Sequence, residues 1–184
     1  DASGNVGVGT TVPAAKLDVA GDACINSVRV GRGRCNVSNN TAVGTDALNS
    51  ATGECNTGLG YQALINNTTG CRNTAVGYHS SYCNLTSQGN TSVGFQSLYY
   101  NTTGCYNAAV GMYALHKNTA SSNTAMGYGA LICNTSTGGN AAFGNSALYY
   151  NTASNNTGLG YQAGYSITTG ADNTAVGSQS LRNS

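Results

Sequence analysis

The stretch NTAVG at Asn73–Gly77 decides the fold, because the same five letters begin again at Asn40 and at Asn173. Six near copies lie between the outer two, so the motif occurs nine times at intervals of 16 or 17 residues. Such self-similarity at a fixed period is the sequence signature of a solenoid, in which stacked repeats bury one continuous core. Each copy starts with an asparagine, which predicts a ladder of nine: Asn40, Asn56, Asn73, Asn90, Asn107, Asn123, Asn140, Asn156 and Asn173.

Counted from that asparagine as position one, the repeat reads roughly NTAVGYQALYxNTTG. Position four is always apolar, and we expect its side chains inside the coil. Positions three and eight are always Ala, Gly or Ser, which should let another backbone come close. Position five is glycine in every copy, which predicts a sharp bend with positive φ or a close backbone approach there. These bend glycines are Gly44, Gly60, Gly77, Gly94, Gly111, Gly127, Gly144, Gly160 and Gly177.

The repeat favours strand over helix. Helical solenoid units usually need more than about 30 residues, and a glycine with Asn-Thr runs in every copy is poor helix material. The sequence therefore predicts an all-β fold, a parallel β-solenoid with two short β-like stretches in each turn. We expect a lead-in segment over 1–39 and nine repeats over 40–184, the last of them truncated, as in a piece of a longer fibre.

The composition argues against most functional classes. Only 7% of the residues are charged and the net charge is +1, so no basic surface for nucleic acid is expected. No apolar run approaches the roughly 20 residues of a membrane span. The few acidic residues are scattered, and His79 and His116 are expected to be lone surface histidines. We therefore expect no catalytic, metal or cofactor residues and no enzyme activity.

The repeats resemble the heads of trimeric autotransporter adhesins and, more closely, the NTAVGYxAL repeats of phage and giant-virus tail-fibre-like proteins. This resemblance covers Asn40 to Ser184. The leading run GNVGVGT at Gly4–Thr10, followed by AKLDV at Ala15–Val19, is similar to an element that often precedes such repeats. The resemblance implies a left-handed β-roll with three chains side by side. It also implies a structural or adhesive fibre outside the cell, on a cell or virion surface.

The seven cysteines form no CxxC pair, so a zinc site is not expected. Neighbouring turns lie within disulfide reach, which allows Cys55–Cys71 or Cys71–Cys83 within one chain. Cys105 and Cys133 have no obvious mate on an adjacent turn, and the odd count suggests intermolecular pairing. Buried free thiols remain the alternative for all of these cysteines.

Two more rows suggest surface roles. Asn67, Asn84, Asn101 and Asn134 are sequons at one turn position, so we expect an exposed edge that a secretory pathway could glycosylate. Asn90 is also a sequon, but it belongs to the asparagine ladder and is expected to stay unmodified. Tyrosines recur at positions six and ten, where they could pack between turns or form an aromatic stripe for sugars or another fibril.

The function expected from these features is that of a self-associating fibre shaft or adhesin head. A narrow coil has little interior, so Leu98, Leu115 and Leu148 are expected to need a partner chain, and a homotrimer is the expected assembly. Its external partner would be a surface glycan or receptor. Two other solenoid functions stay open, ice binding through the threonines of position two and carbohydrate binding through the tyrosine rows.

Overall fold

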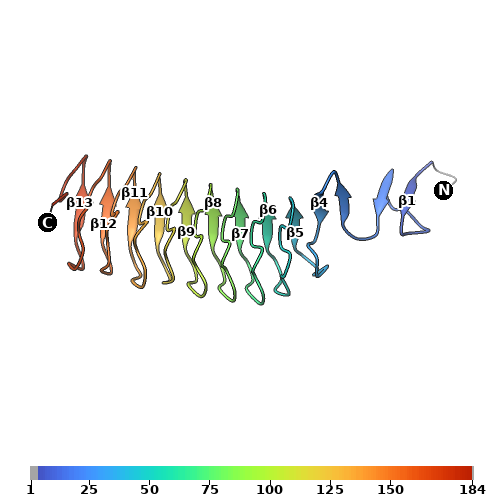
Figure 1. The fold of residues 1–184 in the computed structure, drawn as a ribbon, viewed down its shortest axis with the longest axis horizontal. Helices are drawn as coiled ribbons and strands as arrows, with labels where there is room; N and C mark the ends of the chain where they lie inside the picture. Colours follow the sequence, from blue (N-terminus) through green and yellow to red (C-terminus); the bar gives the residue numbers. More distant parts are fainter. Residues whose placement is uncertain (1–3, 184) are drawn as a thin grey trace.

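The computed structural model describes residues 4–183 and shows an elongated rod of stacked coils (Figure 1). Every regular element in this part of the chain is a β-strand, which excludes the helical alternative. The strands are β1 Val6–Val8, β2 Leu17–Val19, β3 Ala23–Ile25, β4 Val28–Gly31, β5 Thr41–Val43, β6 Thr57–Leu59, β7 Thr74–Val76, β8 Thr91–Val93, β9 Ala108–Val110, β10 Thr124–Met126, β11 Ala141–Phe143, β12 Thr157–Leu159 and β13 Thr174–Val176.

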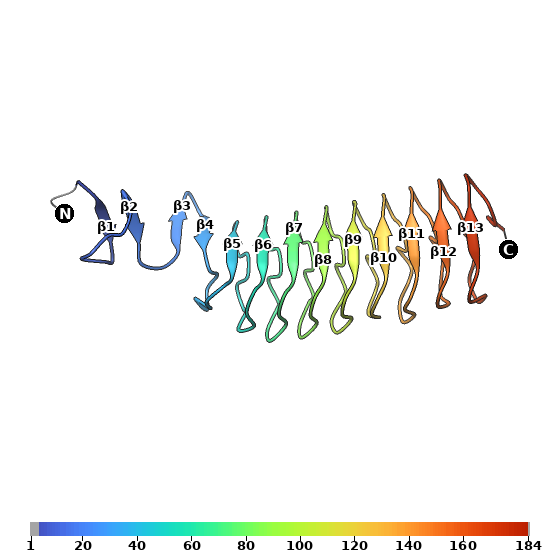
Figure 2. The same cartoon turned by 180° about the vertical axis from the view of Figure 1, so that it is seen from behind.

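Strands β5 to β13 form the rod, one strand to a repeat. Each pairs in parallel with the next, in the order of the sequence, and equivalent positions of successive repeats lie side by side. Thr74, for example, pairs with Thr91, and Val76 pairs with Val93. Figure 2 shows the same regular stack from behind. The predicted parallel β-solenoid, with one turn per repeat, is confirmed.

The lead-in segment covers the first edge of the stack. Strands β3 and β4 form an antiparallel hairpin, and β4 pairs antiparallel with β5, so the main sheet has eleven strands. The carboxylate of Asp22 fixes this hairpin, because it pairs with Arg29 at 2.9 Å and accepts the backbone N–H of Arg32. Strands β1 and β2 form a separate parallel pair. The hairpin thus supplies β5 with a backbone partner that an open sheet edge would lack.

The second half of each repeat is not a strand, which corrects the expectation of two strand-like stretches. It is a run of turns in which positions seven and nine have positive φ, as at His79 (φ 52°) and Ser81 (φ 50°). Backbone hydrogen bonds still join the turns. The His79 N–H donates to the preceding turn, at Tyr61 O, and the Ser81 N–H donates to the following turn, at Ser97 O. The left-handed residues let positions eight and nine both face inward, which a regular strand with its two-residue period cannot do.

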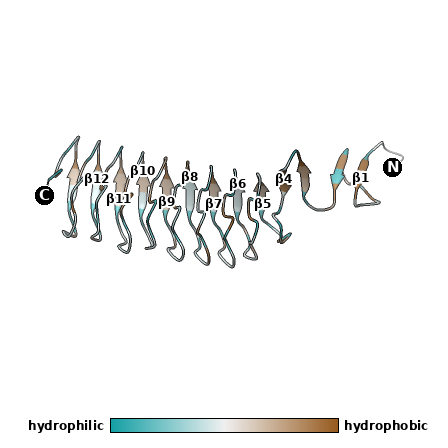
Figure 3. Ribbon diagram, in the orientation of Figure 1, coloured by the Kyte–Doolittle hydropathy of each residue, from teal (hydrophilic) through white to brown (hydrophobic). Residues whose placement is uncertain are grey.

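The core lies between position three of the strand and positions eight and nine of the turn run. The expectation that position four points inward is wrong. Ala75 at position three is fully buried, whereas Val76 at position four is partly exposed. In a three-residue strand the side chains alternate, so only the middle one can point into the coil. Figure 3 shows white to brown colours along strands β5 to β13 and a mixture of teal, white and brown along the turns.

The leucines of position nine fill the interior of a single chain. Leu98, Leu115 and Leu148 are 0% exposed, so the expectation that they need a partner chain is also wrong. The small residues of positions three and eight face the same narrow interior and leave room for these leucines, rather than for a partner's backbone. The apolar surface that remains exposed therefore belongs to other rows.

Candidate functional site

The bend glycines form one edge of the coil. Gly94 has φ of +135°, and a Cβ built there would lie 2.6 Å from the carbonyl oxygen of Gly111 in the next turn. The first eight glycines of the row share this geometry, with φ between +130° and +137°. Gly177, the last, has φ of +110° and no atom within 4 Å of its built Cβ. The glycines of this row allow neighbouring turns to stack closely. They offer no side chain for catalysis or binding.

The position-one asparagines form a continuous hydrogen-bonded ladder inside the coil. The side-chain oxygen of Asn56 accepts the backbone N–H of Asn73 at 3.0 Å, and that of Asn73 accepts the N–H of Asn90. The Asn56 amide group donates to Gly70 O at 2.9 Å. These links satisfy backbone groups that burial would otherwise leave unpaired. Asn90, a sequon, is buried within this ladder.

Position twelve supplies a second buried asparagine row, which corrects the expectation of an exposed, glycosylated edge. Asn67, Asn84, Asn101 and Asn134 are at most 1% exposed. The Asn84 amide donates to the Asn67 side-chain oxygen at 2.8 Å. An amide enclosed in this way has no room for a glycan in the folded coil. Asparagine suits the position because its amide can bond to both the turn backbone and the next asparagine.

The outer side of the strands presents two rows, the position-two residues and the apolar position-four residues. Several of the latter are large and exposed, among them Leu59, Phe143 and Leu159. The surrounding shaft is almost uncharged, with four Asp, Glu, Lys or Arg residues from Asn56 to Ser184. An apolar row that repeats on every turn of a nearly neutral face is typical of a protein–protein contact.

The turn run carries the aromatic side chains, which stack from turn to turn. Position-six rings Tyr61 and Tyr78 lie 5.2 Å apart at an interplanar angle of 12°, and Tyr78 stacks in the same way on Phe95. Position-ten rings Tyr82 and Tyr99 are 5.0 Å apart at 2°. Packing between turns, one of the two expected roles, therefore accounts for these stacked pairs. Tyr128 and Tyr161, also at position six, have no stacked partner among the described residues and are 50% and 48% exposed, so the exposed aromatic stripe stays open for that row.

The two histidines belong to this aromatic surface and are not lone surface residues. The His79 ring lies 3.9 Å from that of Tyr78, and the His116 ring stacks on Tyr99 at 5.3 Å. Burial lowers the pKa of both imidazoles, and for His116 the charge of Lys117 lowers it further, while a hydrogen bond to Gln96 O raises it. Burial also raises the pKa of Tyr99.

The cysteines lie on different sides of the coil. Cys71 and Cys105 lie on the turn edge, the side of the coil formed by positions fourteen to sixteen. The Cys71 thiol contacts the Gln88 side chain at 3.6 Å, and the Cys105 sulfur accepts the Gln88 backbone N–H. Cys83 and Cys133 lie instead on the aromatic side, the surface of the turn run that carries the rings of positions six, seven, ten and eleven, and both occupy position eleven. All seven cysteines are free thiols in the structure. Cys55 and Cys71 line one shallow pocket on adjacent turns, whereas Cys71 and Cys83 belong to different rows.

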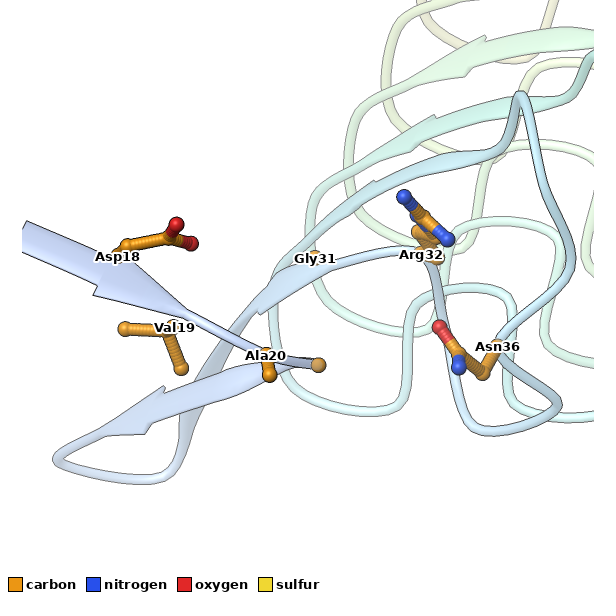
Figure 4. Close-up of a pocket in the computed structure, with 7 residues that line it drawn as sticks. Asp18, Val19, Ala20, Gly31, Arg32 and Asn36 are labelled. Carbon is orange, nitrogen blue, oxygen red and sulfur yellow. The ribbon is translucent and has the colours of Figure 1, made fainter. Parts of the chain in front are cut away.

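A second hollow lies within the lead-in segment, between the end of β2 and the loop that follows β4 (Figure 4). Asp18, Arg32 and Asn36 line it, together with small residues. The Asp18 carboxylate already accepts the backbone N–H of Ala14 at 2.9 Å. Within residues 4–183 no three His, Cys, Asp or Glu side chains come close enough together to hold a metal ion. The part of the chain that the structure describes contains no helix long and apolar enough to cross a membrane.

Sequence reasoning missed Tyr100 and Tyr150, which stand at position eleven beside the position-ten column. The available signal was the string LYYNT, which occurs at both Leu98 and Leu148.

No protein-family model, curated protein or solved structure matches this chain. The resemblance to fibre and adhesin repeats therefore continues to rest on the repeat motif.

Proposed function

We propose that this chain is a length of an extracellular fibre that associates with copies of itself and has a structural or adhesive role. The observation that carries the proposal is the apolar position-four row, which a single chain leaves exposed along the strand face. Leu159 is 49% exposed, Leu59 44% and Phe143 37%. Burying such a row is worth roughly 25 cal/mol per Å², and each further turn adds the same contact.

Three copies, the number that the resemblance implies, would enclose these rows in a shared core by meeting at their strand faces. The aromatic side would then face outward, because positions eight and nine separate it from the strands. The nearly uncharged surface supports side-by-side packing, since little like-charge repulsion opposes it. A non-catalytic role on a cell or virion surface fits the same features.

Sedimentation of the chain across a concentration series tests this proposal. We expect a multimer, with three chains as the preferred mass, and a weaker assembly for Val76→Asp, which places a charge in the strand-face row. Thr86→Asp is the matched control, because Thr86 is exposed on the turn edge of the same repeat. A monomeric mass at every concentration would refute the association, and equal effects of the two variants would refute the assigned face.

Disulfides between copies of this chain are a further part of the proposal, with Cys105 and Cys133 as the candidates. Cys133 lies on the aromatic side, which faces outward in the strand-face assembly, so a bridge through it would join neighbouring fibres rather than the chains of one trimer. Both thiols are partly exposed, on the turn edge and on the aromatic side respectively. We expect a non-reducing gel of the denatured protein to show bands above the monomer that Cys105→Ser or Cys133→Ser removes. Monomer bands alone would leave the fibre held by non-covalent contacts and would refute the cross-link.

A further inference from the structure

Tyr100 and Tyr150 differ from every stacked tyrosine in how their rings are turned. The Tyr100 ring is tilted by 73° from that of Tyr99 and by 84° from that of His116, at centroid distances of 4.7 and 5.3 Å. The Tyr150 ring stands in the same way against Tyr149 and Tyr165, at 69° and 87° and at 4.7 and 5.4 Å. Each therefore spans two consecutive rings of the position-ten column.

This geometry turns one face of Tyr100 toward solvent. The faces of Tyr99 are already covered by Tyr82 on one side and by His116 on the other. The column must therefore meet Tyr100 with its ring edges, and the short centroid distances require those edges to lie against the face of Tyr100. Of Tyr100, 49% is exposed, from which we infer that its opposite face is open to solvent.

Tyr150 presents a second platform of the same kind. Its ring angles and centroid distances repeat those of Tyr100, and 46% of the residue is exposed. Both occupy position eleven, where each N–H donates to position ten of the following turn, as Tyr100 N does to His116 O and Tyr150 N does to Tyr165 O. The two platforms thus lie in one row, three turns apart, or about 14 Å along the rod at the usual strand spacing.

The residues around the platforms favour a neutral, hydroxyl-rich ligand. Lys117 and Cys133 fill the row between them, and Lys117 is the one charged side chain from Cys83 to Ala171. Exposed threonines flank the row at position thirteen, among them Thr119 and Thr135. An outward aromatic face attracts the positively polarised C–H groups of a sugar ring, because the face carries negative charge density.

We propose that Tyr100 and Tyr150 form a binding site for an extended, β-linked polysaccharide that lies parallel to the rod. In such a chain each pyranose advances by nearly the length of one solenoid turn, so sugars three residues apart would rest on the two platforms. The site lies on a single chain. The proposal names a ligand for the adhesive role, and only this assignment of a role rests on the proposed function.

Titration calorimetry of the intact chain with cellohexaose and with chitohexaose tests the site. We expect at least one hexasaccharide to bind, and Tyr100→Ala or Tyr150→Ala to weaken binding about tenfold or more. Tyr100→Phe keeps the ring and should keep most of the affinity. Tyr161→Ala is the control, because Tyr161 is equally exposed at 48% but stands in the position-six row. Cellobiose, too short to reach both platforms, should bind more weakly than the hexasaccharide.

Three outcomes would overturn the site. The first is that neither hexasaccharide binds. The second is that Tyr161→Ala weakens binding as much as the two platform variants do. The third is that Tyr100→Ala changes the sedimentation of the protein, which would make the row a contact between copies of this chain. Since Val76→Asp tests association separately, a failed glycan titration leaves the fibre proposal standing, and a monomeric chain leaves the glycan site standing.

Discussion

Replacing Gly60 by alanine should destabilise the coil, whereas the same change at Gly58, two residues earlier, should be tolerated. A Cβ at Gly60 would lie 2.5 Å from the carbonyl oxygen of Gly77 and 2.8 Å from its carbon, and φ at Gly60 is +133°. Strain at such a φ costs about 1–3 kcal/mol, and forcing the turns apart adds about 1–3 kcal/mol. The expected loss of stability is therefore about 2–6 kcal/mol.

At Gly58 the built Cβ lies 3.2 Å from Ala63 O and from Leu48 Cγ, and φ is not positive. Six of the nine repeats have alanine at this position. Alanine lowers the entropy of the unfolded chain, a gain of about 0.4–1 kcal/mol that offsets the tight fit. We expect Gly58→Ala to change the stability by less than about 1 kcal/mol in either direction.

Urea denaturation followed by circular dichroism measures both variants, and hydrogen exchange locates the damage. The Gly77 N–H, which donates to Leu59 O at 2.8 Å, should lose protection in Gly60→Ala first. Gly177→Ala separates strain from clash, because its φ is +110° but its Cβ would meet no atom within 4 Å. Equal stabilities of Gly60→Ala and Gly58→Ala would refute the reasoning.

Two substitutions test the interior, and a pH series tests the histidines of the aromatic surface. Ala75→Asp places a charge inside the coil and should cost at least about 3 kcal/mol in urea denaturation, since nothing there pairs with it; a stability like that of the parent would contradict the assigned core. Asn73→Ala leaves one buried N–H and one carbonyl unpaired and should cost about 1–3 kcal/mol for each, which the same assay measures; a neutral result would make the ladder dispensable. Burial depresses the pKa of His79 and His116 in the folded chain, so the folded state holds their imidazoles neutral more strongly than the unfolded state does. The free energy of unfolding is therefore unaffected by these groups above about pH 6.5 and decreases as the pH falls from there through the lowered pKa. The melting temperature should therefore fall on acidification, and less so in a variant with glutamine at both positions.

The sequence by itself determined the architecture. Nine copies of one motif at a constant interval permit few folds other than a stack, because a single repeat cannot bury its apolar residues alone. The invariant glycine of position five likewise pointed to a bend with close backbones. Both inferences rest on periodicity and on the stereochemistry of single residues, which are local properties of the chain.

Only the tertiary structure decided which side of each row is inside. Ala75 and Val76 are neighbours, and the sequence favoured the larger one for the core, but the narrow coil admits the alanine and turns the valine outward. The asparagines of position twelve read as turn residues and proved to be buried, because the interior needs amides to satisfy its turn backbone. The ring orientation of Tyr100 depends on neighbours one turn away. Periodicity shows which residues share a row, whereas the direction in which a row faces depends on the backbone path around the turn.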